Sequence, residues 1–265
     1  MPDSRRPRPL PPPPFEMGQH RWALLLDVDG CLLDFADDPA RVEVPQALRH
    51  TLSRLHAGLD GALALVSGRR IDDLDRLFGH PGWAMAGLHG LQLRGPDGHR
   101  DDVAVDPAQT RRMRLLAGEL AQRLDLPLED KGIAVALHCR TRPERQAELE
   151  REAGRLAAQL QGYELQRGDR VVEFKPAGVD KGSAVQALLA RPPFAARRPV
   201  YLGDDLTDEH AFAAVNRCGG LSVRVGRRTP SQAAFTLPDP RAVHDWLGAV
   251  LEACAVSPTQ LKESR

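Results

Sequence analysis

Two aspartates near the start of the chain have a spacing suited to phosphoryl chemistry. Arg21 to Val28 reads RWALLLDV, an apolar run that leads into Asp27, and Asp29 follows two positions later. A carboxylate can attack a phosphoryl group and form an aspartyl phosphate, while a second one protonates the leaving alcohol and then activates water. We therefore interpret Asp27 as a nucleophile and Asp29 as an acid–base catalyst.

Three more polar clusters follow predicted strands or begin a predicted helix. They are Ser67-Gly68-Arg69, Lys181-Gly182 and the acidic segment GDDLTDE from Gly203 to Glu209. In parallel sheets, ligands bind outside the carboxyl ends of the strands. We therefore expect the clusters to meet in one site.

The acidic residues of these clusters predict a magnesium site. Three or more converging carboxylates repel one another without a cation, and oxygen ligands favour Mg²⁺. We expect Asp27, Asp29 and Asp204 to hold the metal. Asp205 and Asp208 would orient a ligand or a water molecule from outside the coordination sphere.

The remaining polar residues predict a phosphate site. Ser67 and Gly68 offer hydrogen-bond donors to the phosphoryl oxygens. The ammonium group of Lys181 would place positive charge where phosphoryl charge sits and would also hold Asp27, so Lys181 is both a phosphate-binding and a catalytic candidate.

Each cluster has a simpler explanation when it is taken alone. The D-x-D-G sequence could begin a calcium loop, but Gly30 stands at loop position four, where position six is required, and no Glu stands at position twelve. Ser67 to Arg69 could be an ordinary turn, and the acidic segment a solvated helix cap. Lys181 could be a solvated helix residue, because the rest of a nucleotide-binding loop is absent.

The elements that must position these clusters alternate between strand and helix. Apolar runs predict strands at 21–28, 62–66 and 83–86. Leu48, Leu52 and Leu55 share one face of a predicted helix that Gly58 ends, and a shorter helix carries Ile71, Leu74 and Leu77. A hairpin is expected at Pro96-Asp97-Gly98. This alternation predicts an α/β fold with a parallel-sheet core.

The middle of the chain has a different order of elements. We expect a helix over 107–124, a strand over 133–139, a helical stretch over 143–160, and strands over 163–166 and 171–174. This order predicts a smaller α+β unit inserted into the larger domain. The α/β pattern then returns, with a helix that Asp180 caps, a strand at 199–202, a helix that Thr207 caps, a strand at 221–225 and a helix at 240–254.

The expected domain boundaries follow from these patterns. Residues 1–19, with the proline run from Pro11 to Pro14, are expected to be a disordered proline-rich segment, and 256–265 a flexible tail. The catalytic core is expected at 20–104 and 177–255, and the inserted α+β unit at 105–176.

Composition narrows the class of protein. The 265 residues are 42% apolar and 27% charged, with 36 basic and 36 acidic residues. This balance gives no support for a nucleic-acid or membrane partner, and no apolar run is long enough to span a bilayer. The cysteines Cys31, Cys139, Cys218 and Cys254 are widely scattered, as expected for reduced thiols in a cytoplasmic protein.

The four clusters, in this order, resemble the haloacid dehalogenase superfamily of phosphotransferases. The resemblance implies a HAD-like Rossmannoid core with a cap inserted in it. Asp27 and Asp29 match its first motif, Ser67 the second, Lys181 the third, and Asp204 with Asp208 the fourth. Cys31 stands where the superfamily usually has Thr, which affects fine positioning more than chemistry.

A narrower resemblance covers the chain from about Trp22 to Val225. The segments GLHG at 87–90, ALHCR at 136–140, VVEFKP with VDKG over 171–182, and GDDLTDEHAF at 203–212 resemble the trehalose-6-phosphate phosphatases. That family implies Mg²⁺-dependent hydrolysis of trehalose 6-phosphate to trehalose and phosphate, in trehalose biosynthesis, with a cap that closes over the sugar. By position, it implies these sugar contacts: Arg69, His89, Lys131, His138, Arg140, Glu173 and Lys175.

Ordinary roles remain open for these contacts, and other functions remain open for the chain. His138 could be a core histidine, and Glu173 with Lys175 a surface ion pair, although each strand places its polar pair on one face. The substrate could be another sugar phosphate, such as a sucrose or mannosylglycerate phosphate. A non-catalytic phosphoryl-binding module is the other alternative. The presence of Asp29 disfavours such a module, because a protein that only accepts a phosphoryl group needs no second acid–base residue.

Overall fold

The computed structural model describes residues 8–9, 21–34, 42–168 and 170–256. The chain divides into two compact units, one made of Met1–Asp101 with Asp180–Arg265 and the other of Asp102–Val179. The second unit contains the whole range 105–176 in which the sequence predicted an insertion. Among the described residues, no helix is long and apolar enough to cross a membrane.

The first unit is built on a nine-stranded sheet with the order β1-β13-β12-β11-β2-β3-β4-β5-β6. Its five central strands run parallel, and they are β12 (Leu221–Val225), β11 (Arg198–Gly203), β2 (Trp22–Leu26), β3 (Leu63–Val66) and β4 (Ala84–Gly87). The edges are formed by β1 (Arg8–Pro9), β13 (Phe235–Leu237), β5 (Gln92–Arg94) and β6 (Arg100–Asp102). Every residue of β2, β3 and β4 is buried, as expected for parallel strands covered on both faces.

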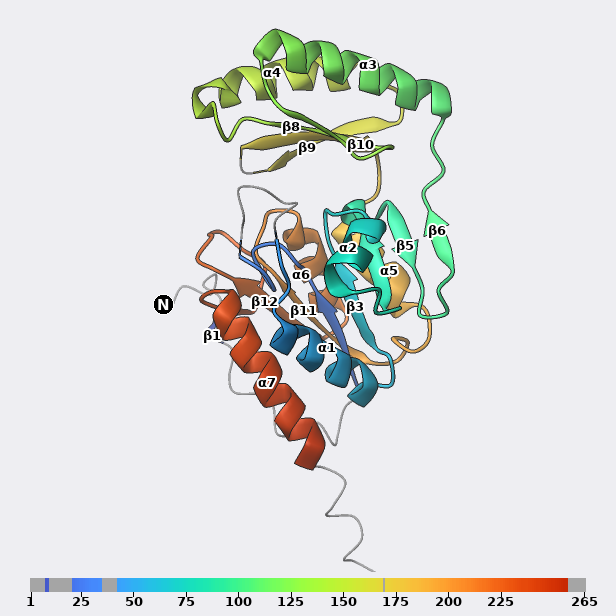
Figure 1. The fold of residues 1–265 in the computed structure, drawn as a ribbon, viewed down its shortest axis with the longest axis vertical. Helices are drawn as coiled ribbons and strands as arrows, with labels where there is room; N and C mark the ends of the chain where they lie inside the picture. The colour runs from blue at the N-terminus through green and yellow to red at the C-terminus, as the bar shows by residue number, and fades with distance from the viewer. Residues whose placement is uncertain (1–7, 10–20, 35–41, 169, 257–265) are drawn as a thin grey trace, which may run out of the picture. The chain divides into compact units, whose positions relative to one another are not determined.

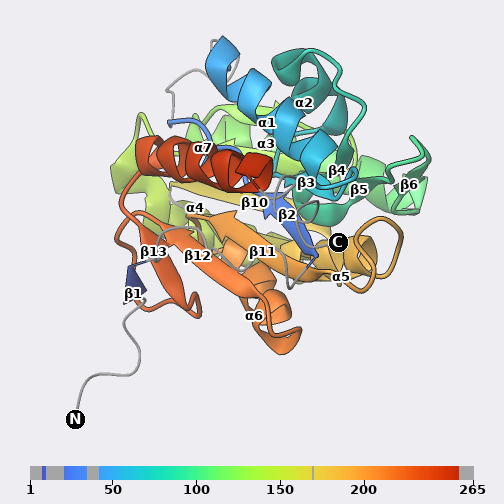
Figure 2. The same cartoon turned by 90° about the horizontal axis from the view of Figure 1, so that it is seen from below.

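Helices cover both faces of this sheet (Figure 2). One face carries α1 (Gln46–Gly58), α2 (Ile71–Phe78) and α7 (Pro240–Val256), and the other carries α5 (Lys181–Leu189) and α6 (Asp208–Arg217). In α1 the buried residues are Leu48, Leu52 and Leu55, the three that the helical spacing placed on one face. Burying one such side chain stabilises a fold by about 1.5–3 kcal/mol.

The second unit is an antiparallel four-stranded sheet covered by two helices (Figure 1). The strand order is β7 (Leu128–Asp130), β8 (Val135–His138), β10 (Val171–Pro176) and β9 (Tyr163–Gly168). The helices α3 (Pro107–Leu124) and α4 (Gln146–Ala157) pack on one face of the sheet, and the short helix η3 (Pro143–Arg145) precedes α4. This unit has a hydrophobic core of its own, which includes Met113, Leu137 and Phe174.

Sequence and structure differ in a few elements. The prediction missed β7, because all its residues are exposed and it lacks an apolar pattern, and it also missed the short edge strand β13. Thr207 does precede α6, but it has helical backbone angles and its side chain makes no capping hydrogen bond, so its predicted role was wrong. Asp180 does cap α5, through a capping box with Ser183.

The predictions for the ends of the chain fall largely outside the described residues. Within 1–19, where disorder was expected, Arg8 and Pro9 are described, and they form β1, which pairs with β13. The proline run from Pro11 to Pro14 and the tail from 257 onward lie outside the described part of the chain.

Candidate active site

Asp27 follows β2 directly, where the strand gives way to a tight loop. Its backbone N–H donates to the carbonyl oxygen of Leu202 at 2.9 Å, which continues the pairing of β2 with β11. The loop then turns at Gly30, whose φ of 80° is accessible to glycine at no steric cost. The Asp27 side chain is therefore presented at the carboxyl end of the sheet while remaining 4% exposed.

Lys181 reaches Asp27 from the first turn of α5. Its ammonium nitrogen donates to Asp27 Oδ1 at 2.8 Å and to Asp208 Oδ1 at 2.7 Å. Burial lowers the pKa of Lys181, but the two carboxylates outweigh burial and raise it above its usual value, so the side chain is charged. The sequence-based expectation that Lys181 holds Asp27 agrees with this geometry.

Two close backbone approaches fix this arrangement. A Cβ added at Gly182 would lie 2.6 Å from the carbonyl oxygen of His210, so α5 and α6 can pack this closely only with glycine there. A Cβ added at Gly203 would lie 2.4 Å from the carboxyl carbon of Asp208. Both glycines therefore leave room that Lys181 and Asp208 need in order to meet.

Asp208 is the centre of a buried hydrogen-bond network. Besides Lys181, the Tyr201 hydroxyl donates to its Oδ1 at 2.6 Å, and the backbone amides of Asp204 and Asp205 donate to its Oδ2 at 3.0 and 2.9 Å. The sequence analysis missed Tyr201. The only available signal was a hydroxyl-bearing residue in the apolar run that leads into GDDLTDE.

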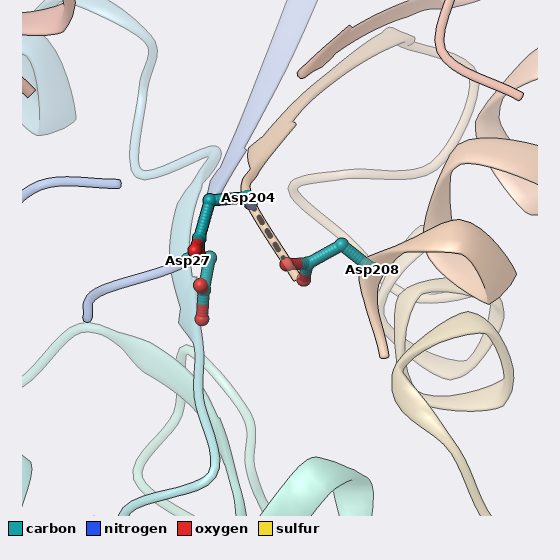
Figure 3. Close-up of side chains that lie close together, drawn as sticks. All are labelled: Asp27, Asp204 and Asp208. Atoms are coloured by element: carbon teal, nitrogen blue, oxygen red, sulfur yellow. Dashed lines mark hydrogen bonds between the residues drawn. The ribbon is translucent and has the colours of Figure 1, made fainter. Parts of the chain in front are cut away.

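The carboxylates of Asp27, Asp204 and Asp208 converge, with oxygen atoms within 4.8 Å of one another (Figure 3). Burial, followed by the charge of Asp208, raises the pKa of Asp204 to about 7. Burial and the same neighbour also raise the pKa of Asp27. Asp204 Oδ1 is buried and has no hydrogen-bond partner. A hard divalent cation held by Asp27 and Asp204 would supply the missing partner and the missing charge, so these residues fit Mg²⁺.

The Asp29 side chain is directed to a different partner. Both of its oxygens accept hydrogen bonds from Arg69, from Nε at 2.7 Å and from Nη2 at 2.7 Å. The three-carboxylate cluster therefore contains Asp208, whereas the sequence analysis had placed Asp29 among the metal ligands. Asp205, expected to orient a ligand, pairs with Arg228 at 3.3 Å.

The residues expected to bind phosphate and their neighbours form a compact turn after β3. Ser67 is 1% exposed, and its Oγ accepts a hydrogen bond from the Arg69 amide at 3.1 Å. His89 lies in the short helix η2 (Leu88–Gly90), and its amide donates to the Ser67 carbonyl oxygen at 2.9 Å. A Cβ on Gly68 would lie 2.7 Å from the His89 ring. The structure thus brings Ser67, Gly68, Arg69 and His89 together.

Cys31 lies next to Asp27 in a fully buried position. Burial, followed by the charge of Asp27, raises the pKa of the Cys31 thiol, so the thiol is neutral. Of the other cysteines whose side chains are described, Cys139 is buried and Cys218 is exposed.

The second unit carries the other predicted residues, and Glu173, Lys175 and His138 lie on the sheet face opposite its helices, because their neighbours along the strands belong to the core under the helices. Lys131 donates to Glu173 at 2.9 Å, and Lys175 pairs with Glu164 at 2.7 Å. Glu173 and Lys175 thus pair with other residues and not with each other, which was the alternative that the sequence analysis considered.

The histidine predicted on this face also has an acidic partner. His138 Nε2 lies 3.0 Å from a carboxylate oxygen of Glu129. The sequence analysis missed Glu129, in β7, and Glu164, in β9. Strand alternation could have found Glu164, which pairs in register with Lys175. Arg140 lies beyond the end of β8 and is exposed.

Comparison with known proteins places the chain among relatives of one kind. The sequence profile of the family described as Trehalose-phosphatase matches residues 25–241. A probable trehalose-phosphate phosphatase of Sinorhizobium fredii is 45% identical over 233 residues, covering 86% of this chain and 87% of the relative. The trehalose-6-phosphate phosphatase of Escherichia coli is 39% identical over 234 residues, covering 88% of each.

Solved structures agree with the fold. The C-terminal domain of a Candida albicans trehalose-6-phosphate phosphatase superposes with a TM-score of 0.82 at 22% identity, covering 94% of this chain and 99% of that one. A haloacid dehalogenase-like hydrolase from Bacteroides thetaiotaomicron gives a TM-score of 0.65 at 17% identity, covering 87% and 99%. These likenesses show that the chain shares its fold with these two proteins, and the profile together with the 45% and 39% identical relatives identifies the enzyme family. The chain belongs to the trehalose-phosphatase family of phosphomonoester hydrolases.

Proposed function

We propose that this chain hydrolyses trehalose 6-phosphate to trehalose and inorganic phosphate, with Mg²⁺ as cofactor. The observation that carries the proposal is the pairing of Lys181 with Asp27 at 2.8 Å beside the unpartnered oxygen of Asp204, in a member of this family. A bound Mg²⁺ would neutralise charge on the phosphoryl oxygens and draw Asp27 and Asp204 together.

The first half of the proposed reaction transfers the phosphoryl group to the enzyme. A carboxylate oxygen of Asp27 attacks phosphorus, and the bond from phosphorus to the sugar O6 breaks. Asp29 gives its proton to the leaving O6. Ser67 and Lys181 stabilise the phosphoryl oxygens, and Lys181 keeps Asp27 ionised and oriented.

The second half returns the enzyme to its starting state. Asp29, now a carboxylate, takes a proton from water, and the resulting hydroxide attacks the phosphorus of the aspartyl phosphate. The bond from phosphorus to Asp27 breaks and releases inorganic phosphate. Arg69 gives one hydrogen bond to each oxygen of Asp29, which leaves a lone pair on each oxygen for the proton that Asp29 transfers.

We also propose that residues 105–176 act as a cap and that its polar sheet face binds the sugar. The chemistry of this face supports the assignment. Lys131, Glu173, His138 and Lys175 bring donors and acceptors to one side of the sheet, and a disaccharide needs many directed hydrogen bonds. Reduced, separated cysteines and a small-molecule substrate fit a cytoplasmic enzyme.

The direct test is phosphate release from a panel of sugar phosphates. Trehalose 6-phosphate, sucrose 6-phosphate, a mannosylglycerate phosphate and p-nitrophenyl phosphate are assayed with Mg²⁺ and with excess chelator. We expect the highest kcat/KM for trehalose 6-phosphate and loss of release in chelator. A higher kcat/KM for another sugar phosphate would contradict the substrate assignment, and full activity in chelator would contradict the metal.

A further inference from the structure

The carboxylate of Asp208 has a hydrogen bond at each site that its two oxygens offer. Lys181 and the Tyr201 hydroxyl bind Oδ1 at 2.7 and 2.6 Å. The amides of Asp204 and Asp205 bind Oδ2 at 3.0 and 2.9 Å. A carboxylate has about four lone-pair sites, so Asp208 is saturated. It lies within 4.8 Å of the other carboxylates, yet it cannot bind a cation without losing one of these bonds.

Of these four donors, Tyr201 is the side chain that donates to Asp208 without also donating to Asp27. Lys181 is shared with Asp27, and the other two donors are backbone amides. The Tyr201 ring is fully buried and packs edge-on against Phe212, with ring centroids 5.7 Å apart. Burial and the charge of Asp208 raise the pKa of Tyr201, so the hydroxyl keeps its proton and acts as the donor.

We propose that Tyr201 is a positioning residue that keeps Asp208 out of the metal's coordination sphere and thereby makes the site select magnesium over calcium. The inference rests on the proposed function, because it takes the metal at Asp27 and Asp204 as given. Mg²⁺ is bound through one or two carboxylates and keeps several waters, whereas Ca²⁺ takes about six to eight oxygen ligands. A third available carboxylate therefore favours Ca²⁺ more than Mg²⁺.

Replacing the hydroxyl tests this role directly. Tyr201→Phe keeps the buried ring and frees one lone pair of Asp208. Mg²⁺ and Ca²⁺ are each titrated into the metal-free full-length protein by calorimetry. We expect the ratio of the Ca²⁺ to the Mg²⁺ dissociation constant to fall at least about tenfold, mainly through tighter Ca²⁺ binding, which corresponds to about 1.4 kcal/mol.

The chain's other tyrosine provides a matched control. Tyr163 also has a hydrogen-bonded hydroxyl, which contacts Thr110 Oγ1 at 2.9 Å and the Ile133 carbonyl oxygen at 3.1 Å in the second unit. Tyr163→Phe removes a comparable hydroxyl without touching Asp208, and we expect it to keep the metal ratio of the unmodified protein.

The outcomes separate this inference from the proposed function. If circular dichroism shows that Tyr201→Phe is folded and its ratio of Ca²⁺ to Mg²⁺ dissociation constants is unchanged, the inference is overturned and the proposed function is not. Failure of the unmodified protein to bind Mg²⁺ overturns the proposed metal site and the inference together.

A second measurement covers a variant that does not fold. In Tyr163→Phe, tyrosine labelled with ¹³C at Cζ reports the Tyr201 hydroxyl by NMR. Saturating Mg²⁺ should leave the resonance that of a hydrogen-bonded phenol. A resonance that moves to that of an unbonded phenol shows that the metal has taken Asp208 and overturns the proposal.

Discussion

At the scale of single residues, the site separates its carboxylates by the partners each one has. Lys181 holds Asp27 and Asp208, Arg69 holds Asp29, and Arg228 pairs with Asp205. Asp204 has a buried oxygen with no hydrogen-bond partner. These five aspartates thus acquire different chemistry from the cations and amides that face them.

The proposed nucleophile can be tested by an isosteric change. Asp27→Asn should abolish phosphate release from trehalose 6-phosphate, because it removes the attacking oxygen and a metal ligand together, while thermal unfolding remains cooperative. Asp245→Asn, on an exposed position of α7, is the matched control and should retain full activity. Near-normal release by Asp27→Asn would exclude a covalent aspartyl intermediate.

The proposed acid–base residue should show its role in the second half of the reaction. Asp29→Asn should slow phosphoenzyme breakdown by roughly 10²–10⁴-fold, the usual scale for losing a general acid or base. Quenched-flow detection of acid-stable phosphoprotein measures each step separately. A loss of less than about tenfold in both steps would remove Asp29 from the assigned role.

At the scale of elements, the packing of α5 against α6 places Lys181 between two carboxylates. Gly182 permits the approach, since an added Cβ would lie 2.6 Å from the backbone of His210. The capping box of Asp180 and Ser183 fixes where α5 begins. The position of Lys181 therefore depends on a helix start and a helix contact as much as on its own bonds.

A pair of glycine substitutions tests this contact. Gly182→Ala should destabilise the fold by about 1–3 kcal/mol, because the obstructing atoms are backbone and cannot move aside cheaply, and it should lower kcat by displacing Lys181. Gly248→Ala in α7 meets nothing within 4 Å and should be neutral or should stabilise by about 0.4–1 kcal/mol. Denaturant unfolding of both variants measures the difference. Equal stability of the two would show that the α5–α6 contact is not tight.

The polar sheet face of the second unit makes a prediction about substrate choice. Glu173→Ala and His138→Ala should each lower kcat/KM for trehalose 6-phosphate at least about tenfold, on the order of 1.4 kcal/mol, with little change for p-nitrophenyl phosphate. Remote binding energy helps to position the reacting group, which a small ester cannot exploit.

The control for these two variants removes a charge from the helical side of the same unit. Glu119→Ala, on an exposed position of α3, should leave both substrates unaffected. Equal losses on both substrates by the test variants would place these residues in folding or in the core chemistry.

At the scale of the whole molecule, the buried carboxylates link stability to pH and metal. The pKa of Asp204 is raised to about 7, against about 3.9 for an unfolded chain. The folded protein therefore binds the proton more tightly than the unfolded chain. This contribution to stability is fully present below about pH 3.9 and is lost as pH rises to about 7.

Thermal melts can measure this linkage. In chelator, the Asp204 contribution should lower Tm between pH 5 and pH 8, and Asp204→Asn should flatten that part of the slope. Mg²⁺ should raise Tm most at pH 8, where the carboxylates are ionised. At a hundred times its dissociation constant, the metal should add about 2.7 kcal/mol to the free energy of unfolding. A metal-free slope that is identical in the Asp204→Asn variant would contradict the raised pKa of Asp204.

The sequence by itself determined most of the elements, and it predicted which side chains are candidates for the reacting groups. Continuous apolar runs predicted β2 and β3, helical spacing predicted the buried face of α1, and Asp180 marked the start of α5. These signals are local, so they can be read from neighbouring residues. Short, exposed β7 gave no such signal and was missed.

Only the tertiary structure decided which charge meets which. The sequence grouped Asp29 with the metal ligands, but Arg69, forty positions away, binds both of its oxygens. The sequence analysis also missed Tyr201, which lies in strand β11 and donates a hydrogen bond from its hydroxyl to Asp208. Residue type and spacing determine what a side chain can do. Its partner depends on which strand ends and helix starts the fold brings within about 3 Å, and no local pattern encodes that distance.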